Sequence, residues 1–253
     1  MGLSLIHEAD PSHISDIPIC DIVFVHGLGG HPHKTWTHST SETYWPRDFL
    51  PASITNARIL TYGYDSSIAS FATQTSVSTF AESLLDSLAE QHTTSQQNNR
   101  PLIFIAHSLG GLIVKKALVL SHQNHRREIV DATIGIVFLG TPHRSGSFEN
   151  ISRILQYFCP TLVEENELKA QRTRLCMVSE LLHIQKTFEG FLDQKLHRFR
   201  LISFFEELQT PGFGLVCKSY PNEAIFSDRD RLLMNTLSHR RRTLFYLFMR
   251  ITG

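Results

Sequence analysis

The chain has 253 residues, of which 42% are hydrophobic and 19% are charged, with 24 basic residues balancing 24 acidic ones. This composition suits a globular protein with one sizeable core, and it lacks the excess positive charge that nucleic-acid binding requires. The four cysteines form no C-x-x-C pair, so we expect reduced thiols rather than a set of disulfides.

The first residues, "MGLSLIHEADPSHISD", carry acidic side chains early and have no apolar core of the kind found in a signal peptide. We find no run of residues that is long and apolar enough to cross a bilayer. From these features we expect a cytoplasmic protein.

Short apolar runs alternate with helical patterns along most of the chain. Because the strand-like runs are apolar throughout rather than alternating, they predict a mainly parallel sheet covered by helices on both faces, that is, an α/β fold. The expected strands cover 19–27, 57–65, 101–108, 133–143, 200–207 and 214–219; the expected helices cover 76–92 and 110–121, with a surface loop over 93–100.

The span 147–198 interrupts this rhythm. It has a helical texture with scattered charges, and it is expected to form a helical cap or rim inserted between two strands. No repeat, low-complexity tract or linker divides the chain, so residues 1–253 are expected to form a single domain.

The segment "LIFIAHSLGGLIVKKAL" carries the strongest functional signal. Ser108 follows a predicted strand and precedes a predicted helix, with Ala106 two residues before it and Gly110 two residues after it. This is the context of a nucleophile elbow, in which the residues flanking the serine must be small because strand and helix nearly touch. A serine that only caps a helix would not need small residues on both sides, so we predict that Ser108 is a catalytic nucleophile.

A serine nucleophile needs donors that stabilise an oxyanion. The glycine-rich turn in "VHGLGGHPHKTW" follows the first predicted strand, and we assign the oxyanion hole to the backbone amides of Leu28 and Leu109. A phosphate-binding loop is the alternative, but "HGLGG" lacks the lysine and the Ser or Thr of a P-loop.

Several blocks together resemble a known family, the α/β-hydrolase domain of the serine-active-site-containing, lipase-like proteins, which also occurs in fungal NACHT/ankyrin-type receptors. The resemblance runs from roughly residue 3 to 219, and its blocks are "DIVFVHGLGGHPHKTWTH", "YWPRDFLP", "ARILTYGYD", "PLIFIAHSLGGLIVKKAL", "GIVFLGTPHRSGS" and "LISFFEE". The resemblance implies an α/β-hydrolase fold, esterase- or lipase-like activity, a lipid ester as one substrate class, and a mitochondrial or other organelle-membrane location as the alternative to the cytoplasm.

The resemblance also suggests where the other catalytic groups lie. The "FFE" of the family aligns its acid with Glu206, and Glu207 is second because alternating strand residues point to opposite sides. The family's final block aligns loosely with "MNTLSHRRR", which makes His239 the expected base, in the chain order Ser, acid, His. The sequence departs from the family from Tyr220 onward, and if His239 is not the base, the alternative is a hydrolase-like fold without a working triad.

Around the nucleophile, the residues expected to contact substrate are His26, Gly27, Gly29, His107 and His143. The alternative for His143 is a structural one, in which "TPH" is only a turn and the start of a helix. His31 and His33 could suggest a metal, but no nearby acid or cysteine completes a zinc set, so we expect surface histidines, no metal and no cofactor.

The tail "HRRRTLFYLFMR" mixes arginines with apolar side chains. It predicts either a final helix packed on the sheet or peripheral contact with an anionic membrane surface.

The sequence leads to two hypotheses about function. The first is a serine ester hydrolase acting on a small-molecule or lipid ester; the second is a non-catalytic signalling or interaction module of a receptor. The sequence leaves the oligomeric state open.

Overall fold

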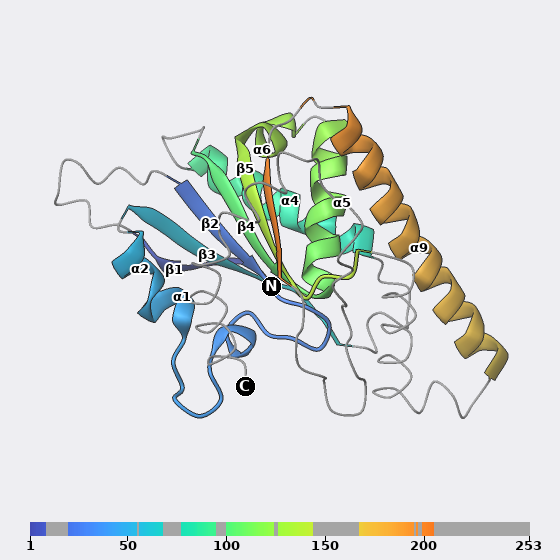
Figure 1. The fold of residues 1–253 in the computed structure, drawn as a ribbon, viewed down its shortest axis with the longest axis horizontal. Coiled ribbons are helices and arrows are strands. Elements are labelled where there is room, and N and C mark those ends of the chain that lie inside the picture. Colours follow the sequence, from blue (N-terminus) through green and yellow to red (C-terminus); the bar gives the residue numbers. More distant parts are fainter. Residues whose placement is uncertain are drawn as a thin grey trace.

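The computed structural model is shown in Figure 1. It describes residues 1–8, 20–54, 56–67, 77–94, 100–123, 126–143, 167–194, 196 and 199–204, and the statements below concern these residues. The strand expected over 214–219 lies outside them.

A six-stranded sheet forms the centre of the molecule, in the order β1-β3-β2-β4-β5-β6. β2 to β6 run parallel, and β1 pairs with β3 in the antiparallel direction. The strands are β1 (Gly2–His7), β2 (Cys20–Val25), β3 (Ala57–Gly63), β4 (Leu102–His107), β5 (Thr133–Leu139) and β6 (Arg200–Phe204). The mainly parallel sheet predicted from the sequence is therefore confirmed, and β1 is an edge strand that the sequence analysis did not anticipate.

Helices cover both faces of the sheet (Figure 1). One face packs against the long helices α4 (Val77–Thr94), α5 (Leu109–Gln123) and α9 (Glu167–Asp193). The other face is covered by the short elements η1 (Lys34–Trp36), α1 (Trp45–Asp48) and α2 (Leu50–Ser53), and α6 (Arg127–Ala132) leads into β5.

The central strand β2 shows why its sequence is apolar without alternation. Val23 and Val25 belong to the core beneath the long helices, while Ile22 and Phe24 belong to the core beneath the short ones. Since both faces are covered, every residue of β2 is buried.

The described half of the predicted insertion is the helix α9, which lies beside α5 in the layer that covers the sheet (Figure 1). Leu181, Ile184, Phe188 and Phe191 are its buried residues in that core. α9 therefore occupies the position of the crossover helix between β5 and β6, whereas a cap or rim was expected here. Residues 144–166 lie outside the described part of the chain, so the single-domain and cap predictions for them stay predictions.

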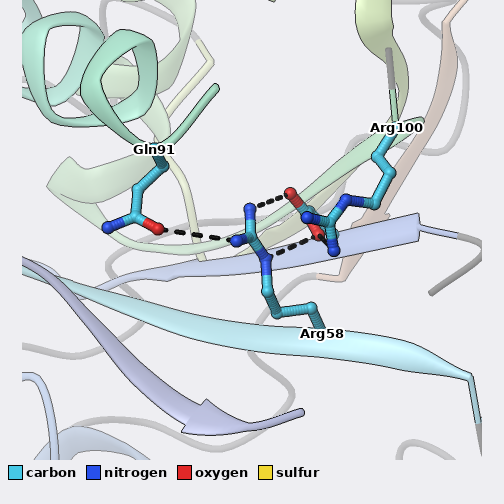
Figure 2. Close-up of polar contacts among 4 residues, drawn as sticks. Arg58, Gln91 and Arg100 are labelled. Carbon is cyan, nitrogen blue, oxygen red and sulfur yellow. Dashed lines mark hydrogen bonds and ion pairs between the residues drawn. The ribbon is translucent and has the colours of Figure 1, made fainter. Parts of the chain in front are cut away.

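A buried ion cluster joins the amino-terminal ends of three neighbouring strands. Arg58 donates from Nε to Asp21 Oδ1 at 2.9 Å and from a terminal nitrogen to Oδ2 at 2.5 Å, and an Arg100 nitrogen lies 3.6 Å from Oδ1. Figure 2 shows that Arg58 is also directed toward Gln91, with a terminal nitrogen of Arg58 lying 3.5 Å from the Gln91 Oε1. Because Asp21 lies at the start of β2 and the strands are parallel, this cluster is at the edge of the sheet opposite to Ser108.

Among the described residues, no helix has the length and apolar character needed to cross a membrane.

Candidate active site

Ser108 lies in the turn between β4 and α5, as the sequence predicts. Its φ is +51°, in the left-handed region that residues other than glycine rarely adopt. Its N–H donates to the carbonyl of Leu139 at 2.9 Å, and its own carbonyl accepts from Gly111 at 3.1 Å. A strained serine held by backbone hydrogen bonds on both sides is the geometry of a nucleophile elbow.

Two glycines allow α5 to begin this close to the sheet. A Cβ on Gly110 would overlap the carbonyl groups of Val25 and His26, and a Cβ on Gly111 would overlap the Thr141 side chain. Ala106, on the strand side, is fully buried. The two glycines noted in the sequence are therefore required by the close approach of α5 to the end of β2 and to the segment after β5.

The predicted oxyanion loop packs directly against the serine. A Cβ on Gly27 would lie 2.8 Å from the Cβ of Ser108, so only glycine fits here without movement. The loop then turns, with the Gly30 N–H donating to the Gly27 carbonyl at 3.0 Å and Gly29 at φ +63°.

Both amides assigned to the oxyanion hole are available as donors in the described part of the structure. Neither the Leu28 N–H nor the Leu109 N–H donates to any group among the described residues. Leu28 follows Gly27 directly, and Leu109 is the first residue of α5, where the helix dipole favours negative charge. Two such amides beside one hydroxyl can stabilise the oxyanion of an acyl-transfer reaction.

His26 is fully buried at the end of β2. Its ring stacks on Tyr64 with centroids 4.3 Å apart, and its Nδ1 is 3.0 Å from the Gly27 carbonyl. Burial lowers the pKa of His26 to about 4, so the imidazole is neutral near pH 7. Its contacts make it a support of the oxyanion loop.

His107 precedes the serine and lies near His26. Burial, with a smaller contribution from His26, lowers the pKa of His107 to about 4. Its Nδ1 has no hydrogen-bond partner among the described residues, and it faces Gly27, where a Cβ would lie 3.2 Å from it. A general base works best with a pKa near the working pH, so neither His26 nor His107 suits that role.

His143 is 4% exposed and lies in the segment that follows β5. Its Nδ1 is 2.7 Å from the Lys115 Nζ, and its Nε2 is 3.3 Å from the Ser203 Oγ. With both ring nitrogens engaged, these contacts favour a structural role for His143 over substrate contact.

Glu206, Glu207 and His239 lie outside the described residues, so their assignments stay predictions. The strand that leads to Glu206 does end at the required edge, since Phe204 pairs with Leu139 and Leu139 pairs with His107. The carbonyl of Phe204 accepts from the Gly140 N–H at 2.9 Å. With one strand between them, the ends of β4 and β6 are about 10 Å apart, a gap that an imidazole can bridge.

The histidines of the loop after β2 make local contacts. His31 Nδ1 accepts from the His33 N–H at 3.0 Å, and His38 Nδ1 accepts from the Ser41 N–H at 3.0 Å. No group of three metal-ligating side chains occurs in the part of the chain that the structure describes.

Sequence reasoning missed two residues near the site, and Lys115 is the first of them. It lies in the segment "GGLIVKKAL", whose apolar character predicted a buried helix, and a lysine at a buried position of that helix was the available signal. Thr141 was also missed; its approach to Gly111 depends on how the segment after β5 lies against the start of α5.

The sheet order, the helices on both faces and the turn at Ser108 define a protein of the α/β-hydrolase fold, which confirms the fold predicted from the sequence. Residues 21–157, more than half of the chain, match the family described as "Putative serine esterase (DUF676)". The chain belongs to this family.

Curated relatives share the name Protein SERAC1. The chain is 29% identical to the Danio rerio protein over 230 residues and 27% identical to the Homo sapiens protein over 231 residues; each alignment covers 83% of this chain and 33% of the relative. The chain thus spans about a third of the length of these relatives.

Solved structures with a similar fold include two hydrolases. The Bacillus licheniformis lipase BlEst2 has a TM-score of 0.47 and 17% identity, covering 82% of this chain and 73% of that protein. A structure described as a putative aryl esterase from Burkholderia cenocepacia has a TM-score of 0.41 and 12% identity, covering 94% of this chain and 83% of that protein.

Proposed function

We propose that this protein is a serine ester hydrolase that cleaves acyl esters through an acyl-enzyme on Ser108. The observation that carries the proposal is the left-handed serine at the start of α5, beside two backbone amides that have no acceptor among the described residues. A serine held only to cap a helix would need neither the strain nor the amides.

In the proposed mechanism, Ser108 Oγ attacks the ester carbonyl while an imidazole removes its proton. The Leu28 and Leu109 amides bind the resulting oxyanion, the protonated imidazole delivers its proton to the leaving alcohol, and a water molecule then releases the acyl group by the same steps. We assign the imidazole to His239 and its orienting carboxylate to Glu206. This chemistry needs no metal or cofactor.

The substrate is proposed to be a small-molecule or lipid ester. The lipid class follows from the resemblance to lipase-like proteins and is consistent with the apolar and basic tail at 239–250, which could lie on an anionic membrane surface. A cytoplasmic location, with an organelle membrane as the alternative, is part of the same proposal.

A fluorophosphonate probe tests the nucleophile directly, because it phosphonylates an activated serine. We expect the wild-type chain to be labelled and Ser108→Ala to be unlabelled. Ser121→Ala is the matched control, since Ser121 lies on the same helix but binds the Arg126 carbonyl at 2.6 Å and is distant from the turn. A folded wild-type chain that fails to react would refute the proposal.

A second candidate is a hydrolase-like signalling or interaction module, as in receptors. The observation that favours it is that the histidines close to Ser108 in the described structure are unsuited as bases: His26 and His107 have a pKa of about 4, and His143 is engaged through both nitrogens.

Replacement of the proposed base separates the two functions. His239→Ala should abolish labelling and the hydrolysis of p-nitrophenyl esters if the protein is an enzyme. If the module hypothesis holds, the wild type will already be inactive toward esters, phospholipids and thioesters, and the substitution will change nothing.

A further inference from the structure

Lys115 is a buried lysine in the middle of α5, with 1% of its surface exposed. Its Nζ lies 2.7 Å from His143 Nδ1 and 2.5 Å from Gln185 Oε1. The same ammonium sits 5.1 Å from the ring centroid of Phe138 and 5.7 Å from that of Phe188. Groups from β5, the segment after β5 and α9 therefore converge on one cation.

The contacts fix the direction of these hydrogen bonds. Gln185 donates from Nε2 to Glu189 Oε1 at 2.6 Å, so its carbonyl oxygen must face Lys115. A buried ammonium is stable only when it is hydrogen-bonded or paired, and here it has two acceptors, two aromatic faces and a carboxylate one link further along. Lys115 is thus the donor to both His143 and Gln185.

The same reasoning shows which ring nitrogen of His143 carries the hydrogen. Because Lys115 donates to Nδ1, that nitrogen carries no hydrogen, and the neutral ring must carry its hydrogen on Nε2. Nε2–H can then donate to Ser203 Oγ, 3.3 Å away on β6. The lysine holds His143 in one tautomer and in one orientation.

His143 in turn ends the segment 139–143, which lies against the nucleophile. The Leu139 carbonyl accepts from the Ser108 N–H, the Gly140 N–H donates to Phe204, and the Thr141 side chain packs against Gly111. This segment is therefore bound to the elbow at one end and to Lys115 at the other.

We propose that Lys115 is a positioning residue for the proposed hydrolase: acting through His143, its ammonium fixes the segment 139–143 and thereby the orientation of Ser108. The inference rests on the proposed function for its effect on rate, but the hydrogen-bonded pair can be measured without any substrate. A displacement of about 1 Å at a reacting group can lower a rate about a hundredfold, so such a support has a measurable effect.

The test compares Lys115→Met with Lys116→Met. The two substitutions are chemically identical and adjacent, but Lys116 is only half-buried and makes none of these contacts among the described residues. With a p-nitrophenyl ester, we expect Lys115→Met to lower kcat between about tenfold and a hundredfold with KM within about twofold, while Lys116→Met leaves both unchanged.

A second pair of variants provides rescue. His143→Gln keeps an acceptor for Lys115 and a donor for Ser203, whereas His143→Leu keeps neither. We expect the glutamine variant to retain most of the fluorophosphonate labelling rate and the leucine variant to lose it. Equal rates for the two would contradict a role for the hydrogen bonds.

Two measurements on the wild type are independent of catalysis. Nitrogen-15 NMR should show His143 protonated on Nε2 alone, and the Ser108 amide should exchange hydrogen slowly, faster in Lys115→Met and unchanged in Lys116→Met. A His143 protonated on Nδ1, or a folded Lys115→Met with wild-type exchange and labelling, would overturn the inference. An unreactive wild type with the expected tautomer and exchange would refute the proposed function but not the pair.

Discussion

Replacement of Gly110 by alanine tests the close approach between α5 and the sheet on which the candidate site depends. The added Cβ would overlap the backbone carbonyls of Val25 and His26, which cannot rotate away as a side chain could. Relief requires α5 or the end of β2 to shift by about 1 Å. Overpacking of this kind typically costs about 1 to 3 kcal/mol, and it outweighs the gain of about 1 kcal/mol that alanine brings to a helix interior.

The matched control is Gly190→Ala on α9, because a Cβ placed there meets no described atom within 4 Å outside its own stretch of helix. There only the helix propensity changes, so we expect a gain of up to about 1 kcal/mol. The free energy of unfolding, measured by urea denaturation followed by circular dichroism, should therefore fall for Gly110→Ala and rise for Gly190→Ala.

The same shift would displace the Leu109 amide and the Ser108 side chain. Fluorophosphonate labelling of Gly110→Ala should slow by about a hundredfold even where the variant is folded. A Gly110→Ala protein as stable as Gly190→Ala, and labelled at the wild-type rate, would refute the tight turn at Ser108.

Two further predictions concern buried charge. The pKa of His26 is about 4 in the folded chain and about 6.5 in an unfolded one, so the unfolded state binds more protons between these pH values. The contribution of His26 to stability should be complete above pH 6.5 and decline as the pH falls toward 4. His26→Phe should make this decline shallower, as measured by urea titrations at several pH values. Asp21→Asn leaves Arg58 and Arg100 buried without their carboxylate and should cost about 3 kcal/mol in the free energy of unfolding by urea.

Each of these two predictions has an outcome that would contradict it. If His26→Phe shows the wild-type pH dependence, His26 is not a group whose protonation unfolds the protein. For Asp21→Asn the control is Arg126→Ala, which removes an ion pair to Asp86 whose two side chains are 40% and 64% exposed, and which should change stability by less than about 1 kcal/mol. Equal losses in the free energy of unfolding for the two variants would show that the buried cluster stabilises the fold no more than an exposed ion pair does.

Features that depend on neighbouring residues in the chain were predictable. The continuous apolar runs predicted β2, β4 and β5, because strands covered on both faces have no polar side to reveal. The turn at Ser108 was also predictable, because its small flanking residues lie within two positions of the serine in the sequence.

Other features arise only when distant segments meet. β1 was missed because its burial is incomplete and its pairing with β3 joins residues about sixty positions apart. The strand expected over 133–143 ends instead at Leu139, because Gly140 takes a φ of +57° and turns the chain toward β6. Likewise, α9 was expected as a cap, but it packs on α5, and its buried apolar residues belong to the same core as those of α5.

By itself, the sequence determined an α/β-hydrolase fold and a serine in a strand–turn–helix context, because both are written in local patterns of apolar and small residues. Only the tertiary structure decided which groups surround that serine. Gly27 packs against it because β2 and β4 are adjacent, and Lys115 gains its partners because α5 and α9 pack against each other on one face of the sheet. Hydrogen bonds and burial between segments set the chemistry of those groups, and no local pattern encodes them.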